Sequence, residues 1–354
     1  VGRQIGLSRE GDPEVHTGLE LSEMDDDELG GILSSGRSLI FSRVNPEHKL
    51  RIVKLLQGQG EVVAVTGDGV NDAPALKRAA IGVAMGQTGT DVAKEASRLV
   101  LLDDSFPTLV DAVREGRTIY SNLRKTVLAS MTTNTAELSI VLLGLVGVAM
   151  GNWAIPILAI QMLAIDLLAE IMPLTFLTYD PPSPGIMSSP PRSQSDHIMN
   201  RSSSLEVLLL GVLIGALAFG NFALYMYRTG EFFFSPEGSG MGDLLTRPGY
   251  WRALTMAYLT IAFCQFANVM SRRYRLRSIF SRNFFTNRVL LWSIAGSIAM
   301  ILLVLLVRPV GELLYFAMPR PVDWLFVLGA AGIFLVAFEV MKAFKRSRSS
   351  GEAG

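Results

Sequence analysis

The sequence predicts an α/β segment over about residues 1–125, followed by an all-α membrane part of six helices. Three observations predict this fold class. Hydrophobic residues make up 49% of the 354 residues and charged residues only 18%, and the mean hydropathy is +0.36, which is typical of a membrane-embedded chain. Short apolar runs alternate with amphipathic segments in the first part. Long apolar stretches dominate the second part.

The first part predicts a parallel, doubly wound sheet. Leu50, Val53 and Leu56 share one face of the first expected helix, and Pro74 suits the first turn of the second. In chain order we expect helices over 46–57, 73–80 and 91–98, alternating with strands over 61–65, 81–84 and 99–102. Ligands of such sheets bind at the carboxyl ends of strands, where residues 66–72 lie.

The second part contains six apolar stretches, each close to the roughly 20 residues that span a bilayer. They cover residues 127–149, 154–178, 205–227, 251–270, 289–307 and 322–341. The loops that share a side with the α/β segment hold 12 Lys and Arg residues, and the opposite loops hold 4. Because inside loops are enriched in Lys and Arg, we expect both chain ends in the cytoplasm, and the plasma membrane as the location.

Composition excludes several classes of function. Lys plus Arg and Asp plus Glu both number 32, so the chain lacks the basic excess of a nucleic-acid-binding protein. Cys264 is the single cysteine, which excludes a disulfide framework and a cysteine-rich zinc site. The three histidines are scattered at positions 16, 48 and 197, which is unlike a histidine metal cluster.

The string Thr66-Gly-Asp-Gly-Val-Asn-Asp-Ala-Pro-Ala-Leu76 follows the first expected strand. Its glycines, Gly67 and Gly69, let the backbone beside Thr66 approach a phosphate closely. Asp68, Asp72 and Asn71 supply the hard oxygen ligands that Mg²⁺ prefers. Lys49, upstream of this turn, can reach a phosphoryl group as a point charge. The alternative is an acidic turn with a solvated lysine.

Polar residues also occur deep in two expected spans. Asn134 and Glu137 share one helix face, as do Asp166 and Glu170 in the next span. An Asp at the bilayer centre costs roughly 2.5–3.5 kcal/mol, so we expect these four groups to converge on one site for a cation. Pro173 is expected to break its helix and free carbonyl groups as further ligands. The alternative is a set of neutral groups hydrogen-bonded between helices.

Three strings together resemble the P-type cation-transporting ATPases, and the similarity covers nearly the whole chain. They are the string at Thr66, Arg43-Val-Asn-Pro-Glu-His-Lys49, and Glu115-Gly-Arg-Thr-Ile-Tyr-Ser-Asn-Leu-Arg124. The resemblance implies a haloacid-dehalogenase-like phosphorylation-domain portion over 1–115, a linker over 116–126, a transport domain over 127–345 and a cytoplasmic tail over 346–354. It implies that Asp68 binds catalytic Mg²⁺, that Asn71 and Asp72 support that site, and that Lys49 contacts the phosphoryl group.

Other strings of that family are absent. The phosphorylated Asp-Lys-Thr-Gly-Thr string, the Thr-Gly-Glu-Ser loop, the nucleotide-domain motif and the first four spans do not occur in these 354 residues. We therefore expect a C-terminal fragment whose partner is the missing N-terminal half of the pump. We also expect most of the ATP site to lie outside this chain, and the chain alone to form no phosphoenzyme.

The same resemblance bears on the transported ion. The Asp166 to Pro173 region resembles the sodium/potassium-pump pattern, whereas a divalent ion balances clustered carboxylates best. We therefore expect Ca²⁺ first and Na⁺ or K⁺ as the alternative, since oxygen ligands without Cys or His select hard cations. Gln265 and Asn268 are possible further ligands, with hydrogen bonding between helices as their alternative role.

A function from another class remains open, namely a non-catalytic membrane subunit or a remnant without activity. Intact Lys49, Asp68 and Asp72 argue against it, because a remnant needs no magnesium site. The acidic pair Asp166 and Glu170 disfavours a lipid flippase. The six spans and the absence of a Cys-Pro motif disfavour a heavy-metal pump, and several converging carboxylates disfavour a proton pump with a single acidic group.

Overall fold

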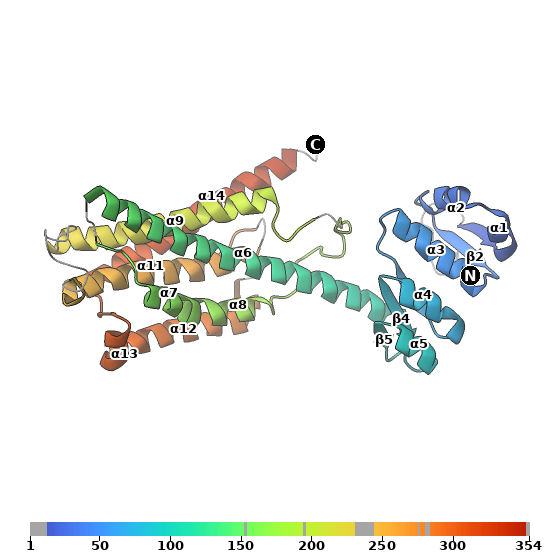
Figure 1. The fold of residues 1–354 in the computed structure, drawn as a ribbon, viewed down its shortest axis with the longest axis horizontal. Helices are drawn as coiled ribbons and strands as arrows, with labels where there is room; N and C mark the ends of the chain where they lie inside the picture. Colours follow the sequence, from blue (N-terminus) through green and yellow to red (C-terminus); the bar gives the residue numbers. More distant parts are fainter. Residues whose placement is uncertain are drawn as a thin grey trace. The chain divides into compact units, whose positions relative to one another are not determined.

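The structure is a computed structural model that describes residues 13–151, 154–193, 196–230, 244–274, 277–279 and 284–351. The chain divides into two compact units, Val1–Val113 and Arg114–Gly354. The first unit holds all the strands that the structure describes, and the second holds the long apolar helices (Figure 1).

The first unit begins with a parallel pair of strands that the sequence analysis did not predict. Strands β1 (Glu14–Thr17) and β2 (Leu39–Ser42) pair along their whole length, and helices α1 (Gly18–Glu23) and α2 (Asp26–Leu33) connect them. Thr17 and Glu20 form a capping box at the start of α1, and Asp25 caps α2. Each strand has only four residues, which is too short for a clear alternation of polar and apolar positions.

A second parallel sheet has the strand order β3-β4-β5, and the predicted alternation with helices is confirmed. Its strands are β3 (Ala64–Gly67), β4 (Ile81–Met85) and β5 (Leu99–Leu101), and the helices are α3 (Pro46–Gly58), α4 (Ala73–Arg78) and α5 (Asp91–Ala96). Strand β3 starts three residues later than predicted. The amide of Glu61 donates to the Leu56 carbonyl at 3.0 Å and closes the end of α3, so this residue cannot join the sheet.

Helix α6 (Phe106–Gly151) is a single helix of 46 residues. It runs without a break through residues 116–126, which the sequence analysis treated as a linker. Beyond Pro107 this stretch contains no proline, and the one glycine, Gly116, is tolerated within a helix at a cost of about 1 kcal/mol. The expected linker is therefore part of the helix that also forms the first span.

The predicted number of spans is confirmed: six helices in the described part of the chain are long and apolar enough to cross a membrane. After α6, the second span consists of α7 (Ala159–Ile165), the π-helix η2 (Asp166–Glu170) and α8 (Ile171–Leu177). The others are α9 (Arg201–Thr229), α11 (Pro248–Arg272), α12 (Arg288–Leu306) and α14 (Pro321–Gly351), with a short α13 (Arg308–Leu313) between the last two. Helix α14 thus extends into the expected tail.

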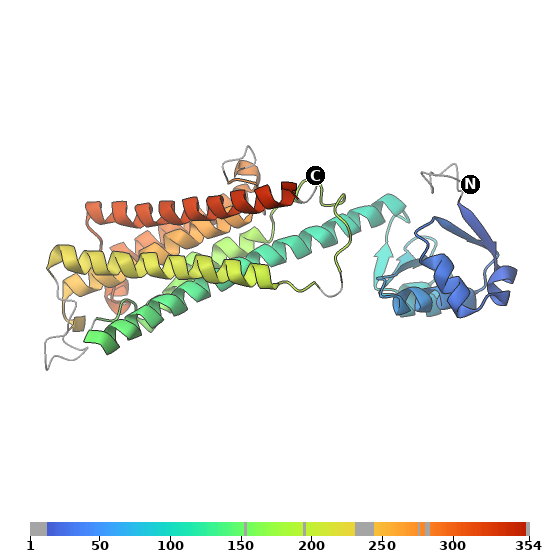
Figure 2. The ribbon, with the colours of Figure 1, turned by 90° about the horizontal axis from the view of Figure 1, so that it is seen from above.

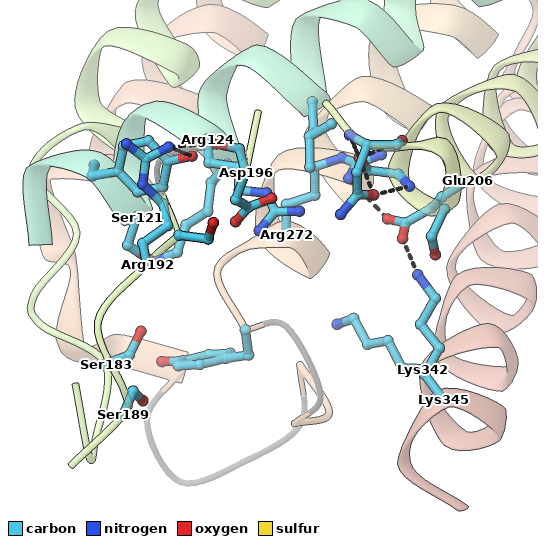
Figure 3. Close-up of a pocket in the computed structure, with 18 of the residues that line it drawn as sticks. Ser121, Arg124, Ser183, Ser189, Arg192, Asp196, Glu206, Arg272, Lys342 and Lys345 are labelled. Carbon is cyan, nitrogen blue, oxygen red and sulfur yellow. Dashed lines mark hydrogen bonds and ion pairs between the residues drawn. The ribbon is translucent and has the colours of Figure 1, made fainter. Parts of the chain in front are cut away.

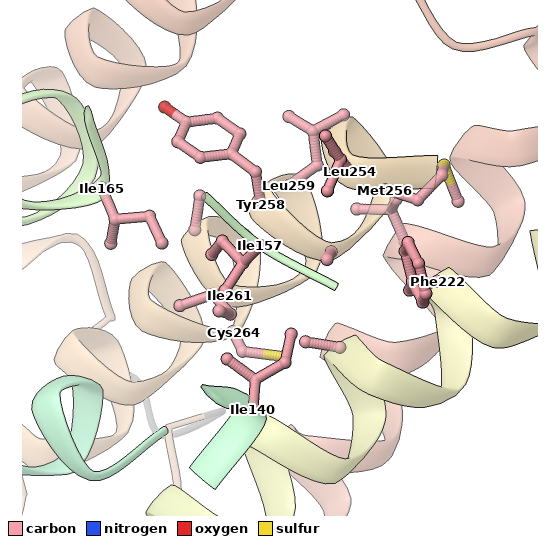
Figure 4. Close-up of a cluster of buried hydrophobic side chains, with 14 of the residues drawn as sticks. Ile140, Ile157, Ile165, Phe222, Leu254, Met256, Tyr258, Leu259, Ile261 and Cys264 are labelled. Carbon is pink, nitrogen blue, oxygen red and sulfur yellow. The ribbon is translucent and has the colours of Figure 1, made fainter. Parts of the chain in front are cut away.

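The long helices run side by side in both views (Figures 1 and 2). Helix α11 is the most buried of the six and packs against both α9 and α14. Its side chains form the centre of the main apolar core, where Ile140 of α6, Phe222 of α9 and Cys264 of α11 belong to one cluster (Figure 4). On the other side of the bundle, α12 packs against η2 and α8.

Helices α6 and α9 approach each other closely at two glycines of α9. A Cβ atom on Gly211 would lie 2.5 Å from Thr135 Cβ, and one on Gly215 would lie 2.6 Å from Ser139 Cβ. Small residues four positions apart let two helix backbones meet, and close packing holds helices together where the hydrophobic effect between them is weak. These two glycines therefore fix the position of α9 against the helix that carries Glu137.

Candidate functional site

The glycine-rich loop lies where the sequence analysis expected it, at the carboxyl end of β3. The chain leaves the strand at Gly67, passes through a short 3-10 turn (Val70–Asp72) and enters α4 directly. Gly67 has no room for a side chain, because a Cβ atom there would lie 2.5 Å from Asp72 Cβ. The turn therefore folds back tightly on itself, and glycine is required at Gly67.

Lys49 and Asp72 meet beneath this loop. Lys49 comes from α3, and its Nζ lies 2.5 Å from Oδ1 of the buried Asp72. The other oxygen, Oδ2, accepts from the backbone amides of Gly69 and Asp68 at 3.3 and 3.4 Å. Burial alone would raise the pKa of Asp72, but the bond from Lys49 and these amides outweigh burial and keep that pKa below its usual range.

Asp68 and Asn71 are exposed, in contrast to Asp72. Both oxygens of Asp72 already have partners within the protein, so the exposed carboxylate of Asp68 is the group that this loop offers to a metal ion. Thr66 is half-buried at the end of the strand. The carbonyl of Asp68 accepts from the Thr90 amide at 2.8 Å, which ties the loop to the start of α5.

Two carboxylates that influence each other electrostatically are buried within the membrane part. Glu137 of α6 and Glu170 of η2 are 7% and 6% exposed, and one oxygen of each has no hydrogen-bond partner in the part of the chain that the structure describes. The side chains of Ser130 and Thr133 on α6 lie close enough to Glu170 to interact with its carboxylate, so the two spans are neighbours at this depth. An unsatisfied buried carboxylate oxygen is costly, and a bound cation or a proton relieves that cost.

The helix between Asp166 and Glu170 is a π-helix, which the sequence analysis did not predict. The amide of Ile171 donates to the Asp166 carbonyl, five residues back. The expected break at Pro173 takes the form of this interruption, which lies in the turn before the proline, where a proline removes a backbone hydrogen bond. The chain does not end its helix there, because α8 continues through Pro173 to Leu177. Wider turns of this type occur often at functional sites, and this one is where the second span presents its two acidic residues.

The four polar groups of these spans do not all converge, contrary to expectation. Glu137 interacts electrostatically with both Asp166 and Glu170, but Asp166 is only half-buried and Asn134 lies on an exposed face. Within the described ranges, no three His, Cys, Asp or Glu side chains are close enough to hold a metal ion together. Positions 134 and 137 differ by only about 60° around α6, so the boundary between the packed and the open side of this helix runs between them.

Gln265 and Asn268 lie on the central helix α11, and both are fully buried. Asn268 Nδ2 donates to the Ala129 carbonyl of α6 at 3.1 Å and to Gln265 Oε1 at 2.9 Å, and Oδ1 accepts from Arg272 Nε at 2.9 Å. Asn268 thus acts in hydrogen bonding between helices, the alternative that the sequence left open. Gln265 Nε2 is buried without a partner among the described residues.

Sequence reasoning missed a group of buried charges at one end of the bundle. Asp180 is 4% exposed and pairs with Arg273 at 2.8 Å and with Lys125 at 3.0 Å. Arg272 pairs with Glu206 at 2.9 Å, and Lys345 binds the same carboxylate. Charged residues just beyond the ends of the apolar stretches were the available signal, but sequence alone cannot tell a buried ion pair from a solvated basic loop.

Comparison with known proteins identifies the family of this chain. Residues 154–344 match the family model described as cation transporting ATPase, C-terminus, and residues 13–80 match haloacid dehalogenase-like hydrolase. The chain is 36% identical over 352 residues to calcium-transporting ATPase 1 of Bacillus cereus, covering 98% of this chain and 38% of that protein. It is 36% identical over 325 residues to the calcium-transporting ATPase of Bacillus subtilis, covering 91% of this chain and 34% of that protein.

A human protein is similar over the same share of the chain as the first bacterial relative. The chain is 33% identical over 350 residues to calcium-transporting ATPase type 2C member 1 of Homo sapiens, covering 98% of this chain and 35% of that protein. The chain therefore spans between a third and two fifths of the length of these relatives. The matches include residues of both the first unit and the second unit.

Proposed function

Since the chain belongs to the family of cation-transporting P-type ATPases, we propose that it forms the C-terminal part of an ATP-driven pump whose transported ion is Ca²⁺. The observation that carries the proposal is the pair of buried carboxylates, Glu137 and Glu170, with unsatisfied oxygens inside an integral membrane domain. Two buried carboxylates, each with one oxygen that has no hydrogen-bond partner among the described residues, fit a hard, divalent cation, which neutralises both charges at once.

In this proposal the first unit, which carries the glycine-rich loop, supports phosphoryl transfer. Bound Mg²⁺ neutralises the charge that develops on the phosphoryl oxygens. Asp68 is the exposed carboxylate that would hold the ion, with the amide oxygen of Asn71 beside it. Asp72 keeps Lys49 at the loop, and the backbone of Thr66, Gly67 and Gly69 would bind a phosphate at the end of the strand. The donor set fits Mg²⁺, which prefers a few carboxylates and phosphate oxygens to a complete protein cage.

The membrane domain holds the ion. Glu137 and Glu170 bind it directly, and Asp166 at the half-buried edge assists its entry. Helix α6 is continuous from Phe106 to Gly151, so a displacement of its first half is transmitted along a rigid element to Glu137. Because phosphorylation and ion binding bias the same two-state element, each site changes the affinity of the other.

Protein outside these 354 residues completes both sites. Asn134 is exposed although it lies in the middle of an apolar span, and an amide facing lipid has no hydrogen-bond partner. A covering helix from the N-terminal part of the pump would give Asn134 a partner and supply the ligands that the two glutamates lack. The same part would supply the phosphorylated aspartate and most of the ATP site. We place both ends of the chain in the cytoplasm, with the plasma membrane as the location.

The alternative of a subunit without activity has less support. The Lys49–Asp72 pair and the crowding at Gly67 preserve an exposed Asp68 on a glycine-rich turn, and none of these is needed for a helical membrane scaffold. A Na⁺ or K⁺ pump remains the nearest alternative through Asp166. The ion-dependence experiment below separates these functions.

The test is ion-dependent phosphorylation in the complete pump, with this chain joined to the part that carries the phosphorylated aspartate. Glu170→Gln and Asp166→Asn should weaken activation by Ca²⁺ about tenfold or more, while the affinity for nucleotide stays nearly unchanged because the soluble site is untouched. Glu312→Gln is the matched control, since Glu312 is an exposed glutamate paired with Arg308. If Na⁺ alone activates phosphorylation, the transported ion is Na⁺ and not Ca²⁺. If both variants keep the ion affinity of the wild type, the proposed ion site is contradicted.

A further inference from the structure

A cavity of about 780 Å³ lies within the membrane unit, at the end of the bundle where the buried charges gather. Four helices and one connecting segment line it. Arg124 comes from α6, Arg192 from the segment between α8 and α9, Arg272 from α11, and Lys342 and Lys345 from α14 (Figure 3). A volume of this size is typical of ligand sites. Neither of the two sites in the proposed function includes this cavity.

The lining is strongly basic. Six Lys and Arg residues line the cavity, against two acidic residues, Asp196 and Glu206. Glu206 is already bound by Arg272 and Lys345. Arg124 has no hydrogen bond or ion pair with the described residues. Lys125 pairs with Asp180 and Lys342 pairs with Glu339, two acidic residues outside the lining. The positive charge that no carboxylate balances is therefore that of Arg124 and Arg192, and it fits an anion.

Arg192 is held in place without a carboxylate. Its guanidinium lies 4.2 Å from the centre of the Tyr120 ring and donates to Tyr120 Oη at 3.0 Å and to the Asp196 carbonyl at 2.6 Å. Stacking on an aromatic ring orients a guanidinium and leaves its charge available to a ligand. In Figure 3, Arg124 and Arg192 lie on one side of the open space and Lys342 and Lys345 on the other.

The cavity straddles the edge of the apolar spans. Arg124 and Lys125 lie just before the apolar stretch that starts at residue 127, and Lys342 directly follows the stretch that ends at 341. The apolar side chains Leu128, Phe338 and Met341 also line the cavity. A ligand that fits both kinds of wall has an anionic head and an apolar tail.

We propose that this cavity binds an anionic phospholipid. The phosphate of its head group lies between two arginines on one side, Arg124 and Arg192, and two lysines on the other, Lys342 and Lys345. The acyl chains leave past Leu128 and Met341. Basic pockets between membrane helices are suited to anionic head groups. Serine hydroxyls at Ser121 and Ser202 supply further hydrogen-bond donors. The lipid would connect α6, which carries Glu137, to α14, so that lipid composition stabilises one arrangement of these helices.

The experiment uses the full chain in detergent and a phosphatidic acid labelled at the end of one acyl chain, with binding followed by fluorescence anisotropy. The wild type should bind this lipid at least tenfold more tightly than phosphatidylcholine with the same label and chains. Arg124→Gln and Arg192→Gln should each weaken binding about fivefold, as expected from about 1 kcal/mol per basic residue. Arg124→Lys should retain most of the affinity, which separates loss of charge from loss of fold.

The matched control is Arg308→Gln, a change of the same type at an exposed arginine of α13 that is outside the cavity. It should bind the lipid like the wild type. Equal affinity for the two lipids, or unchanged binding in both cavity variants, would overturn the proposal. Complete displacement of the labelled lipid by inorganic phosphate at millimolar concentration would instead assign the cavity to a soluble phosphate compound and would also overturn it.

Discussion

Lys49 and Asp72 form a direct ion pair although 22 residues separate them in the sequence, with Lys49 Nζ 2.5 Å from Asp72 Oδ1. The pair joins α3 to the start of α4, and the second oxygen of Asp72 holds the amides of the loop between them. The buried aspartate of the motif is therefore a positioning residue, and the exposed Asp68 is the one available to a ligand.

We predict that Asp72→Asn loosens the loop at neutral pH and has less effect in acid. The folded protein holds the pKa of Asp72 below its usual value. The stabilisation is therefore fully present above the unfolded pKa of about 3.9, and it is lost as the pH falls through the folded pKa. Amide exchange over residues 66–76 should show lower protection in the variant near neutral pH, with the difference shrinking below about pH 4. A difference that is constant with pH would contradict this reasoning.

We predict that Asp68→Asn raises the Mg²⁺ concentration needed for phosphorylation of the complete pump, without lowering the stability of the fold. Asp68 is exposed, so its carboxylate contributes little to folding, whereas the loss of one anionic ligand weakens a hard-cation site. Titration with Mg²⁺ at fixed ATP measures the effect, and we expect a shift of about tenfold or more. Asp27→Asn, at an exposed aspartate of α2, should leave the titration unchanged. An unshifted Asp68→Asn curve would remove Asp68 from the magnesium site.

We predict that Gly67→Ala destabilises the first unit and misplaces Asp72. The new methyl group would lie 2.5 Å from Asp72 Cβ and 2.8 Å from its Cγ, so the turn must open. Such overpacking costs about 1–3 kcal/mol. Gly31→Ala in α2 is the control, because a Cβ there meets nothing within 4 Å. Thermal unfolding of both variants measures the difference, and equal midpoints would argue that the turn adapts without strain.

We predict that Gly215→Ala separates α9 from α6 and lowers the thermal stability of the membrane unit in detergent. The added methyl group would lie 2.6 Å from Ser139 Cβ and 2.8 Å from the Ala136 carbonyl oxygen, within a close helix contact. A loss of about 1–3 kcal/mol is expected. Gly220→Ala lies on the same helix and meets nothing within 4 Å, so its midpoint should equal that of the wild type or exceed it. A stable Gly215→Ala protein would show that α9 can shift freely.

We predict that an engineered cysteine at position 188 is labelled from the cytoplasmic side and one at position 312 from the opposite side. Ser188 and Glu312 are both exposed, and they lie in loops that the basic-residue asymmetry assigns to opposite faces. The native Cys264 is fully buried, so it should contribute no background to a membrane-impermeant reagent. Labelling of both positions from one side would overturn the orientation.

The sequence by itself determined the elements whose cause is local. The number of spans follows from the length and apolarity of each stretch, because an apolar helix of this length is stable only across a bilayer. The glycine-rich string predicted a strand, a tight turn and a helix, and the loop has that order. The pairing of Lys342 with Glu339, three residues away on one helix, follows from helix geometry, and the two groups are 2.9 Å apart.

Tertiary structure decided which polar groups are buried and with what partners. Asp72 and Asp68 look equivalent in sequence, but only Asp72 lies against Lys49. Arg273 belongs to a basic segment between two spans, yet it is buried against Asp180. Asn134 and Glu137 share a helix, but the packing of α6 against its neighbours buries the glutamate and exposes the amide. Such contacts depend on residues far apart in the chain, and their energies depend on a burial that only the packed helices create.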